Sequence, residues 1–156
     1  MKQALGYSLA VFVAALVQSA VVPEFVPHAW APDLLLLTSC VGAWSTTAET
    51  GAALGLWGGL LTAVLSDGYM GSFTFSRLVA AYLVGRLREE VYGDSPVILV
   101  ALIPLACLSA DAVFLLFNPR HYSGYGVLLR QAAATAIAVP LVWFLLKPLT
   151  KDRGLL

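Results

Sequence analysis

Four charged residues stand inside or at the edge of long apolar stretches: Asp33, Arg77, Asp111 and Arg130. In a bilayer, a charge at the centre of a helix costs at least ~2.5 kcal/mol unless it is paired or hydrated. Asp111 lies between two alanines, so we expect an ion pair with Arg130 or Arg77 that offsets part of this cost. A ligand or proton site and contact with a partner protein remain the alternatives.

Two other acidic residues stand where helices should begin. Asp33 directly precedes the apolar run that starts at Leu34, and its carboxylate can accept hydrogen bonds from the free N–H groups of a first helical turn. Glu49 follows Thr46 by three residues, which is the spacing of a capping box. We therefore expect both carboxylates to define helix starts, with contact to a ligand or partner as the alternative for Asp33.

No sequence motif indicates catalysis or cofactor binding. The chain contains no nucleophile elbow, no phosphate-binding loop ending in lysine and no zinc-protease histidine pair. His28 and His121 have no further ligand at metal-binding spacing, and Cys40 and Cys107 lie in apolar segments, where a thiol behaves as a small hydrophobe. We predict no enzyme activity, no cofactor, no metal site and no disulfide.

The composition is that of an integral membrane protein. Hydrophobic residues make up 60% of the 156 residues, charged residues make up 12%, and the mean hydropathy is +0.84. A water-soluble domain of this composition would have too little polar surface to cover itself. The net charge is zero and the basic residues form no run or stripe, so nucleic acid is not expected as a partner.

Polar interruptions divide the chain into six expected membrane spans and predict an all-α bundle forming one transmembrane domain. The expected spans are residues 4–22, 34–48, 51–65, 73–85, 96–117 and 127–146. A straight helix needs ~20 residues to cross the bilayer core, so the second, third and fourth spans are short. Their helices should extend into the adjoining loops, or the bilayer should thin around them.

Basic residues predict the orientation because they concentrate on the cytoplasmic side. With six spans and a cytoplasmic N-terminus, the inner segments hold Lys2, Arg86, Arg88, Lys147, Lys151 and Arg153, and the outer segments hold Arg77, Arg120 and Arg130. This bias places both termini in the cytoplasm. A five-span topology, in which the second and third segments form a re-entrant hairpin, would reverse the C-terminal cluster.

The third expected span carries glycines at four-residue intervals, at Gly51, Gly55 and Gly59. Residues four apart lie on one face of a helix, so this stripe lets another helix approach closely, as small residues do in membrane bundles. The other helix could belong to the same subunit or to a partner.

Several segments together resemble the rod shape-determining protein MreD family. They are Ala31-Pro32-Asp33-Leu34-Leu35-Leu36-Leu37, Gly51-x-x-x-Gly55-Leu56-x-Gly58-Gly59-Leu60-Leu61, a turn with Gly71, and Tyr82-Leu83-x-Gly85. The likeness covers residues 32–85, and the flanking spans match only in number and length. MreD-like proteins often carry an acidic residue near position 63, whereas this chain has Ala63 and then Asp67.

The resemblance implies a non-catalytic scaffold subunit in the bacterial inner membrane. Such a subunit would bind MreC, a protein with one membrane helix and a periplasmic domain. It would act in peptidoglycan synthesis with MreB filaments, the glycan polymerase RodA and a class B penicillin-binding protein.

MreD-like proteins are also similar in fold to the substrate-capture subunits of energy-coupling-factor transporters, which gives a rival function. In that case the six helices would enclose a vitamin-sized ligand near the outer face. The subunit would dock on a transporter through small residues of the first span, such as Ala10 and Ala14. A neighbouring gene for an MreC-like protein would favour the scaffold, and a pair of ATPase genes would favour transport.

Overall fold

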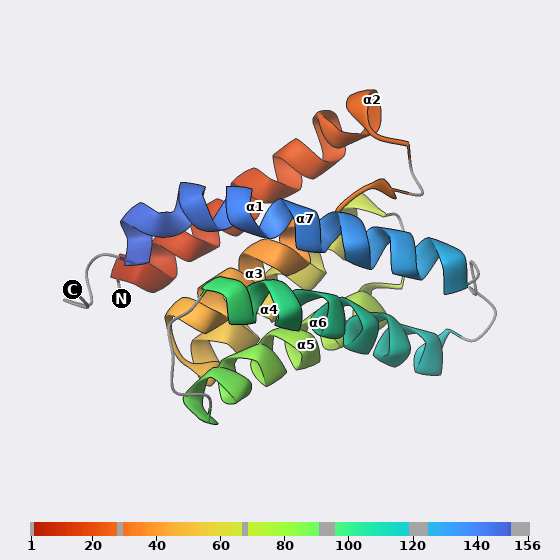
Figure 1. The fold of residues 1–156 in the computed structure, drawn as a ribbon. Coiled ribbons are helices and arrows are strands. Elements are labelled where there is room, and N and C mark those ends of the chain that lie inside the picture. Colours follow the sequence, from red (N-terminus) through yellow and green to blue (C-terminus); the bar gives the residue numbers. More distant parts are fainter. Residues whose placement is uncertain (1, 28–29, 67–68, 91–95, 119–124, 151–156) are drawn as a thin grey trace.

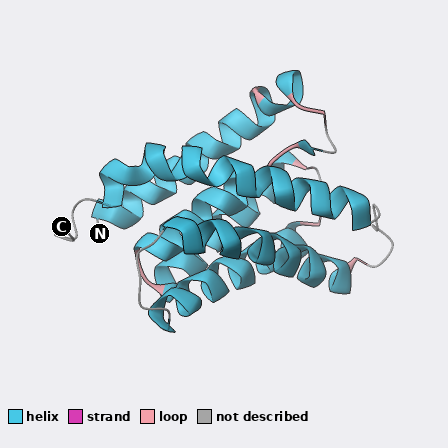
Figure 2. Cartoon of the chain, in the orientation of Figure 1, coloured by secondary structure: helices cyan, strands magenta, loops and turns pink. Residues whose placement is uncertain are grey.

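The computed structural model describes residues 2–27, 30–66, 69–90, 96–118 and 125–150. These described residues form helices joined by short loops, with no strand among them (Figure 2). The helices are α1 (Lys2–Ala20), α2 (Val22–Phe25), α3 (Leu34–Ser45), α4 (Ala48–Leu65), α5 (Met70–Glu90), α6 (Pro96–Phe117) and α7 (Tyr125–Thr150). The predicted all-helical class is confirmed for this part of the chain.

The six longer helices form one bundle around α3, which contacts α1, α4, α5, α6 and α7 (Figure 1). All residues of α3 after Leu34 are buried. Its 12 residues make a helix only ~18 Å long at ~1.5 Å per residue. A helix enclosed by protein on every side does not need to match the bilayer thickness, so α3 can be short.

Four described helical segments are long and apolar enough to cross a membrane: Gln3–Phe25, Ala48–Leu65, Val97–Phe117 and Gly126–Leu149. Two of the six expected spans do not meet these criteria. The second is the short helix α3, and the fourth is α5, which is 21 residues long but contains charged residues that lower its hydropathy. The structure therefore supports a membrane protein with at least these four apolar helices.

Two helix starts test the expected caps. The Asp33 cap is confirmed, because its Oδ1 accepts a hydrogen bond of 2.9 Å from the backbone N–H of Leu36. The Thr46 capping box is wrong by one residue. Thr47 caps α4 by accepting from the N–H of Thr50, whereas the Thr46 hydroxyl donates back to the carbonyl of Gly42.

Of the six expected spans, only 96–117 has the bounds of its helix; α1 and α7 differ from 4–22 and 127–146 by two to four residues at their ends, and the three helices between differ as follows. The helix predicted at 34–48 ends at Ser45, and the next begins at Ala48 rather than at Gly51. Helix α5, predicted at 73–85, extends from Met70 to Glu90. The loop predicted at residues 23–32 begins with the single helical turn α2.

The glycine stripe of α4 packs within the subunit, mainly against α5. A methyl group at Gly55 would lie 2.5 Å from the backbone oxygen of Arg77, and one at Gly59 would lie 2.5 Å from the Cα of Thr74. At Gly51 the nearest atom would be the Cβ of Ala43 on α3, at 2.5 Å. Backbones are therefore in contact along this stripe.

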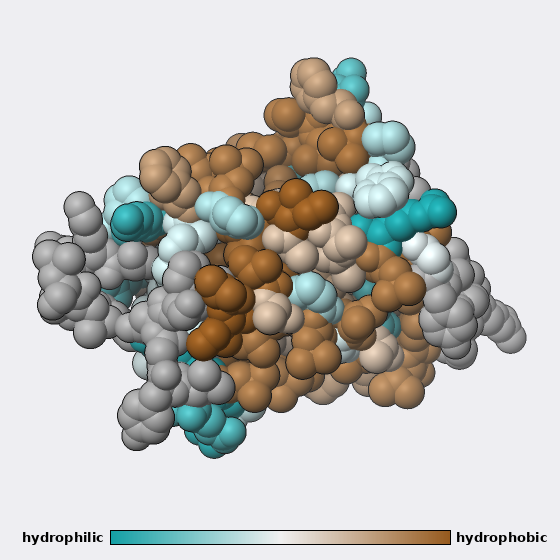
Figure 3. Space-filling model, viewed as in Figure 1, coloured by the Kyte–Doolittle hydropathy of each residue, from teal (hydrophilic) through white to brown (hydrophobic). Residues whose placement is uncertain are grey.

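The apolar surface is concentrated on helices that flank the bundle. Brown, hydrophobic atoms cover the middle of the face shown in Figure 3, and the teal, hydrophilic residues gather mostly toward its ends. Exposed large side chains include Leu5, Leu9, Phe12 and Leu16 of α1, Leu105 and Leu116 of α6, and Ile137, Leu141 and Phe144 of α7. A surface of this kind is expected where lipid chains or another membrane helix cover the protein.

Candidate functional site: a polar cavity at one end of the bundle

A cavity of about 400 Å³ lies at the end of the bundle where α3 begins and α4 ends. Five helices contribute to it, because the short central helix leaves the space beyond its N-terminus to side chains from its neighbours. The lining residues are Gln18, Ala31, Asp33, Thr62, Ser66, Phe73, Ser76, Arg77, Ala110, Asp111, Phe114, Leu115, Leu128 and Gln131. Cavities of this size accommodate small organic ligands.

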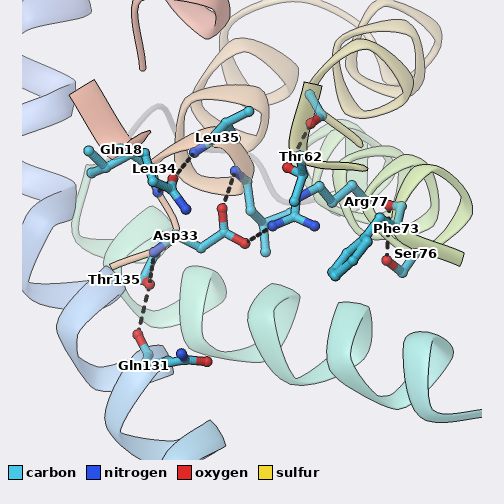
Figure 4. A network of polar contacts seen from close by, with 12 residues as sticks. Gln18, Asp33, Leu34, Leu35, Thr62, Phe73, Ser76, Arg77, Gln131 and Thr135 are labelled. Carbon is cyan, nitrogen blue, oxygen red and sulfur yellow. Dashed lines mark hydrogen bonds and ion pairs between the residues drawn. The ribbon is translucent and has the colours of Figure 1, made fainter. Parts of the chain in front are cut away.

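Asp33 is the centre of a hydrogen-bond network at the floor of this cavity (Figure 4). Its carboxylate caps α3, and its backbone N–H donates to the Thr135 hydroxyl at 3.0 Å. The Gln18 Oε1 accepts from the N–H groups of Leu34 and Leu35 at 2.8 and 3.2 Å. Side chains of α1 and the α3 cap thus satisfy the first N–H groups of α3, which an isolated helix would leave free.

Arg77 reaches from α5 to Asp33 and forms an ion pair with its Oδ2 (Figure 4). The Arg77 side chain is 8% exposed, and its guanidinium carbon lies 5.5 Å from the centre of the Phe73 ring. Its Nε is buried without a hydrogen-bond partner among the described residues. The ion pair links α5 to the start of α3 across 44 positions of sequence.

Asp111 is not the partner of Arg77, in contrast to one of the two pairings we expected. It lines the same cavity as Arg77 and Asp33, but no hydrogen bond or ion pair joins it to another described residue. The other expected partner, Arg130, is exposed and lies 6.0 Å from the centre of the Trp30 ring. Arg77 pairs with Asp33 instead, a pairing that the sequence did not indicate.

A second group of charges lies at the opposite end of the bundle, at the end of α5. Arg88 donates a hydrogen bond of 2.9 Å to the carbonyl of Thr46, and the Glu89 carboxylate lies 3.4 Å from the N–H of Ala48. Arg86 pairs with Glu89 at 2.8 Å, and this hydrogen bond raises the pKa of Arg86. These contacts hold the turn between α3 and α4.

The remaining predicted residues are spread over the molecule. Ala10 and Ala14 are half-buried on α1, beside its fully buried Tyr7 and Val11. Cys40 and Cys107 are both buried in the core. His28 and His121 lie outside the described residues, as does Asp67.

Sequence reasoning missed three polar residues of the cavity and its hydrogen-bond network: Gln18, Gln131 and Thr135. Each could have been identified from the sequence, because a glutamine or threonine within an apolar helix requires a hydrogen-bond partner. Gln18 is in the last part of the first expected span, and Gln131 and Thr135 are in the first part of the sixth. Antiparallel helices bring these two regions to the same end of the bundle.

Comparisons with protein-family models, curated proteins and solved structures find no match to this chain. The fold and site therefore define a class only: an all-helical membrane protein with a partly polar cavity at one end of its bundle.

Proposed function

We propose that this protein is a non-catalytic scaffold subunit of the bacterial cell-elongation machinery, an MreD-like protein that binds MreC. The proposal rests on the resemblance of residues 32–85, and one structural observation supports it. This segment forms the tightly packed centre of the bundle, with glycines of α4 in contact with the backbone of α5. A rigid centre surrounded by apolar helix faces suits a subunit whose task is to hold a membrane partner.

The proposed setting is the inner membrane, with six crossing helices and both termini in the cytoplasm. In this arrangement α3 and α5 also cross: α3 is shielded from lipid by its neighbours, whereas α5 keeps exposed apolar side chains such as Phe75 and Leu83. The cavity then lies in the outer half of the membrane, and the charges at the end of α5 lie on the cytoplasmic side. The class B penicillin-binding protein, RodA and MreB would be reached through MreC or directly.

Co-purification tests the scaffold function. The tagged protein is expressed together with the MreC-like protein encoded in the same genome, solubilised in mild detergent and captured. We expect MreC to be retained through washing, and a single-span membrane protein of unrelated function from that genome to be lost as the control. Equal loss of both proteins would contradict the proposal.

The cavity favours a second candidate, a substrate-capture subunit of an energy-coupling-factor transporter. Its volume of about 400 Å³ lies within the range of small-molecule sites, and it gathers several polar side chains, as such sites do. In this case α1 would dock on the transporter through Ala10 and Ala14. Retention of a transporter transmembrane subunit with its ATPases, instead of MreC, would support this function.

A further inference from the structure

We propose that the cavity binds an ammonium group, carried by a small organic amine or by a lipid head group, with Asp111 as its counter-ion. This site goes beyond the scaffold function and does not depend on it, because it follows from the charges and hydrogen bonds that line the cavity.

The charged side chains that line the cavity do not balance one another. In the described part of the chain they are Asp33, Arg77 and Asp111. Asp33 and Arg77 form an ion pair and neutralise each other, whereas Asp111 pairs with no described residue. When Asp111 is ionised, the lining carries one excess negative charge inside the bundle, where an unpaired charge is costly. A ligand with one positive charge would remove that cost.

The start of a helix attracts an anion when its first N–H groups are free. Here the first N–H groups of α3 already donate to Gln18 and Asp33. Arg77, the cation of the cavity, is committed to Asp33. An anionic ligand would find the first N–H groups of α3 occupied and would face Asp111, so these contacts also favour a cation.

A small recess beside Asp111 suits the size of an ammonium group. Its volume is about 30 Å³, and its lining includes Asp33, Asp111, Gln131 and Thr135. A cavity needs roughly 10–15 Å³ to hold one water-sized group, so a single –NH3+ group would fit. Carboxylate and amide oxygens can accept its three hydrogen bonds.

The rest of the ligand would occupy the main cavity. Phe73 and Phe114 are stacked there with ring centres 4.5 Å apart, and Leu115 and Leu128 complete an apolar wall. Arg77 provides an independent sign that polar contacts are incomplete, because its buried Nε has no partner among the described residues. An acceptor oxygen near the ammonium group would satisfy this N–H.

The test uses the full chain in nanodiscs of phosphatidylcholine, whose head group has no N–H donor. Binding of benzylammonium is compared with that of benzyl alcohol, an uncharged molecule of similar shape, with empty nanodiscs as the background. We expect benzylammonium to bind at least tenfold more tightly, which corresponds to ~1.4 kcal/mol. Equal affinity for the two probes would overturn the proposal.

Variants locate the site. Asp111→Asn keeps the shape of the side chain and should remove the preference for benzylammonium, whereas Glu24→Gln, which alters an exposed carboxylate of α2, should keep it. Leu115→Trp should weaken both probes by filling the cavity, and it tests the site independently if Asp111→Asn does not fold. Unchanged preference in Asp111→Asn, or unchanged binding in folded Leu115→Trp, would contradict the assignment.

A further arm separates the two sources of the ammonium group. The same titration is repeated in nanodiscs that contain phosphatidylethanolamine. If a lipid head group occupies the site, benzylammonium should bind to the wild type at least tenfold more weakly in these nanodiscs. Its binding to Asp111→Asn should not change. Unchanged binding would assign the site to a free amine.

Discussion

Arg77 connects three helices through one residue. Its guanidinium pairs with Asp33 at the start of α3, and its backbone oxygen lies against Gly55 of α4. The arginine itself belongs to α5 and is almost fully buried, so its charge depends on Asp33 for compensation. Removing one partner of such a pair leaves the other charge stranded in a low-dielectric surrounding, which costs more than removing both.

We therefore predict that Arg77→Met lowers the free energy of unfolding by about 3 kcal/mol. Asp33→Asn should lower it as well, although asparagine still caps a helix well, because it strands the Arg77 charge. The double variant should be less destabilised than the sum of the two losses. SDS titration in mixed micelles measures all three values.

Arg130→Met is the matched control for this cycle. Arg130 is exposed and contacts the Trp30 ring, so its loss should cost less than about 1 kcal/mol. Strictly additive losses for Arg77 and Asp33 would show that their ion pair does not stabilise the fold.

At the scale of elements, the contact between α4 and α5 is made by backbone atoms. Four-residue spacing places Gly51, Gly55 and Gly59 on one face of α4, and Gly85 repeats the pattern from α5, where a methyl group would lie 2.6 Å from the Cα of Ala48. Glycine in a helix costs roughly 1 kcal/mol relative to alanine. Close packing of the two helices offsets that cost.

Adding one methyl group to a glycine should destabilise the protein at the contact between α4 and α5 but not at an open surface position. Gly55→Ala places a Cβ against the backbone of α5, which cannot move away as a side chain can, so we expect a loss of about 2 kcal/mol in unfolding free energy. Gly126→Ala, where nothing lies within 4 Å of the added group, should be neutral or slightly stabilising. Thermal unfolding in one detergent compares the two.

A Gly55→Ala protein as stable as Gly126→Ala would mean that α4 and α5 are farther apart than the structure shows. The stripe would then be available to a partner helix. In that case capture of MreC by the Gly55→Ala protein should weaken while the protein remains folded.

At the scale of the molecule, the start of α1 and the end of α7 lie at the same end of the bundle (Figure 1). A methyl group at Gly6 would meet the Leu149 side chain at 2.9 Å, so the first turns of α1 lie against the last turns of α7. The six-span topology that we propose, with both termini in one compartment, is compatible with this arrangement.

We predict that both ends of the chain face one compartment and that residues 23–32 face the other. Reporter fusions after Leu156 and within residues 23–32 should give opposite compartments, with the C-terminus in the cytoplasm because basic residues concentrate at that end. A reporter after residue 90 provides the control and should match the C-terminus. A periplasmic C-terminus together with a cytoplasmic N-terminus would contradict the fold.

Local chemistry made part of this protein predictable from sequence. Apolar composition and helix periodicity depend on neighbouring residues, so the class and approximate helix positions followed directly. The Asp33 cap followed for the same reason, since donor and acceptor are three residues apart. The α4 cap was displaced by one residue because Thr46 and Thr47 are chemically equivalent and only the backbone path selects between them.

The tertiary structure alone decided which distant residues meet. Arg77 had two possible carboxylate partners, and the choice of Asp33 depends on how α5 lies against α3, which no spacing in the sequence records. The partner of the glycine stripe was undecided for the same reason. The cavity is also a tertiary property, because it lies where the short α3 begins and is enclosed by side chains from five neighbouring helices. Sequence determines local geometry through short-range sterics and hydrogen bonds, whereas helix pairing depends on the packing of all the helices together.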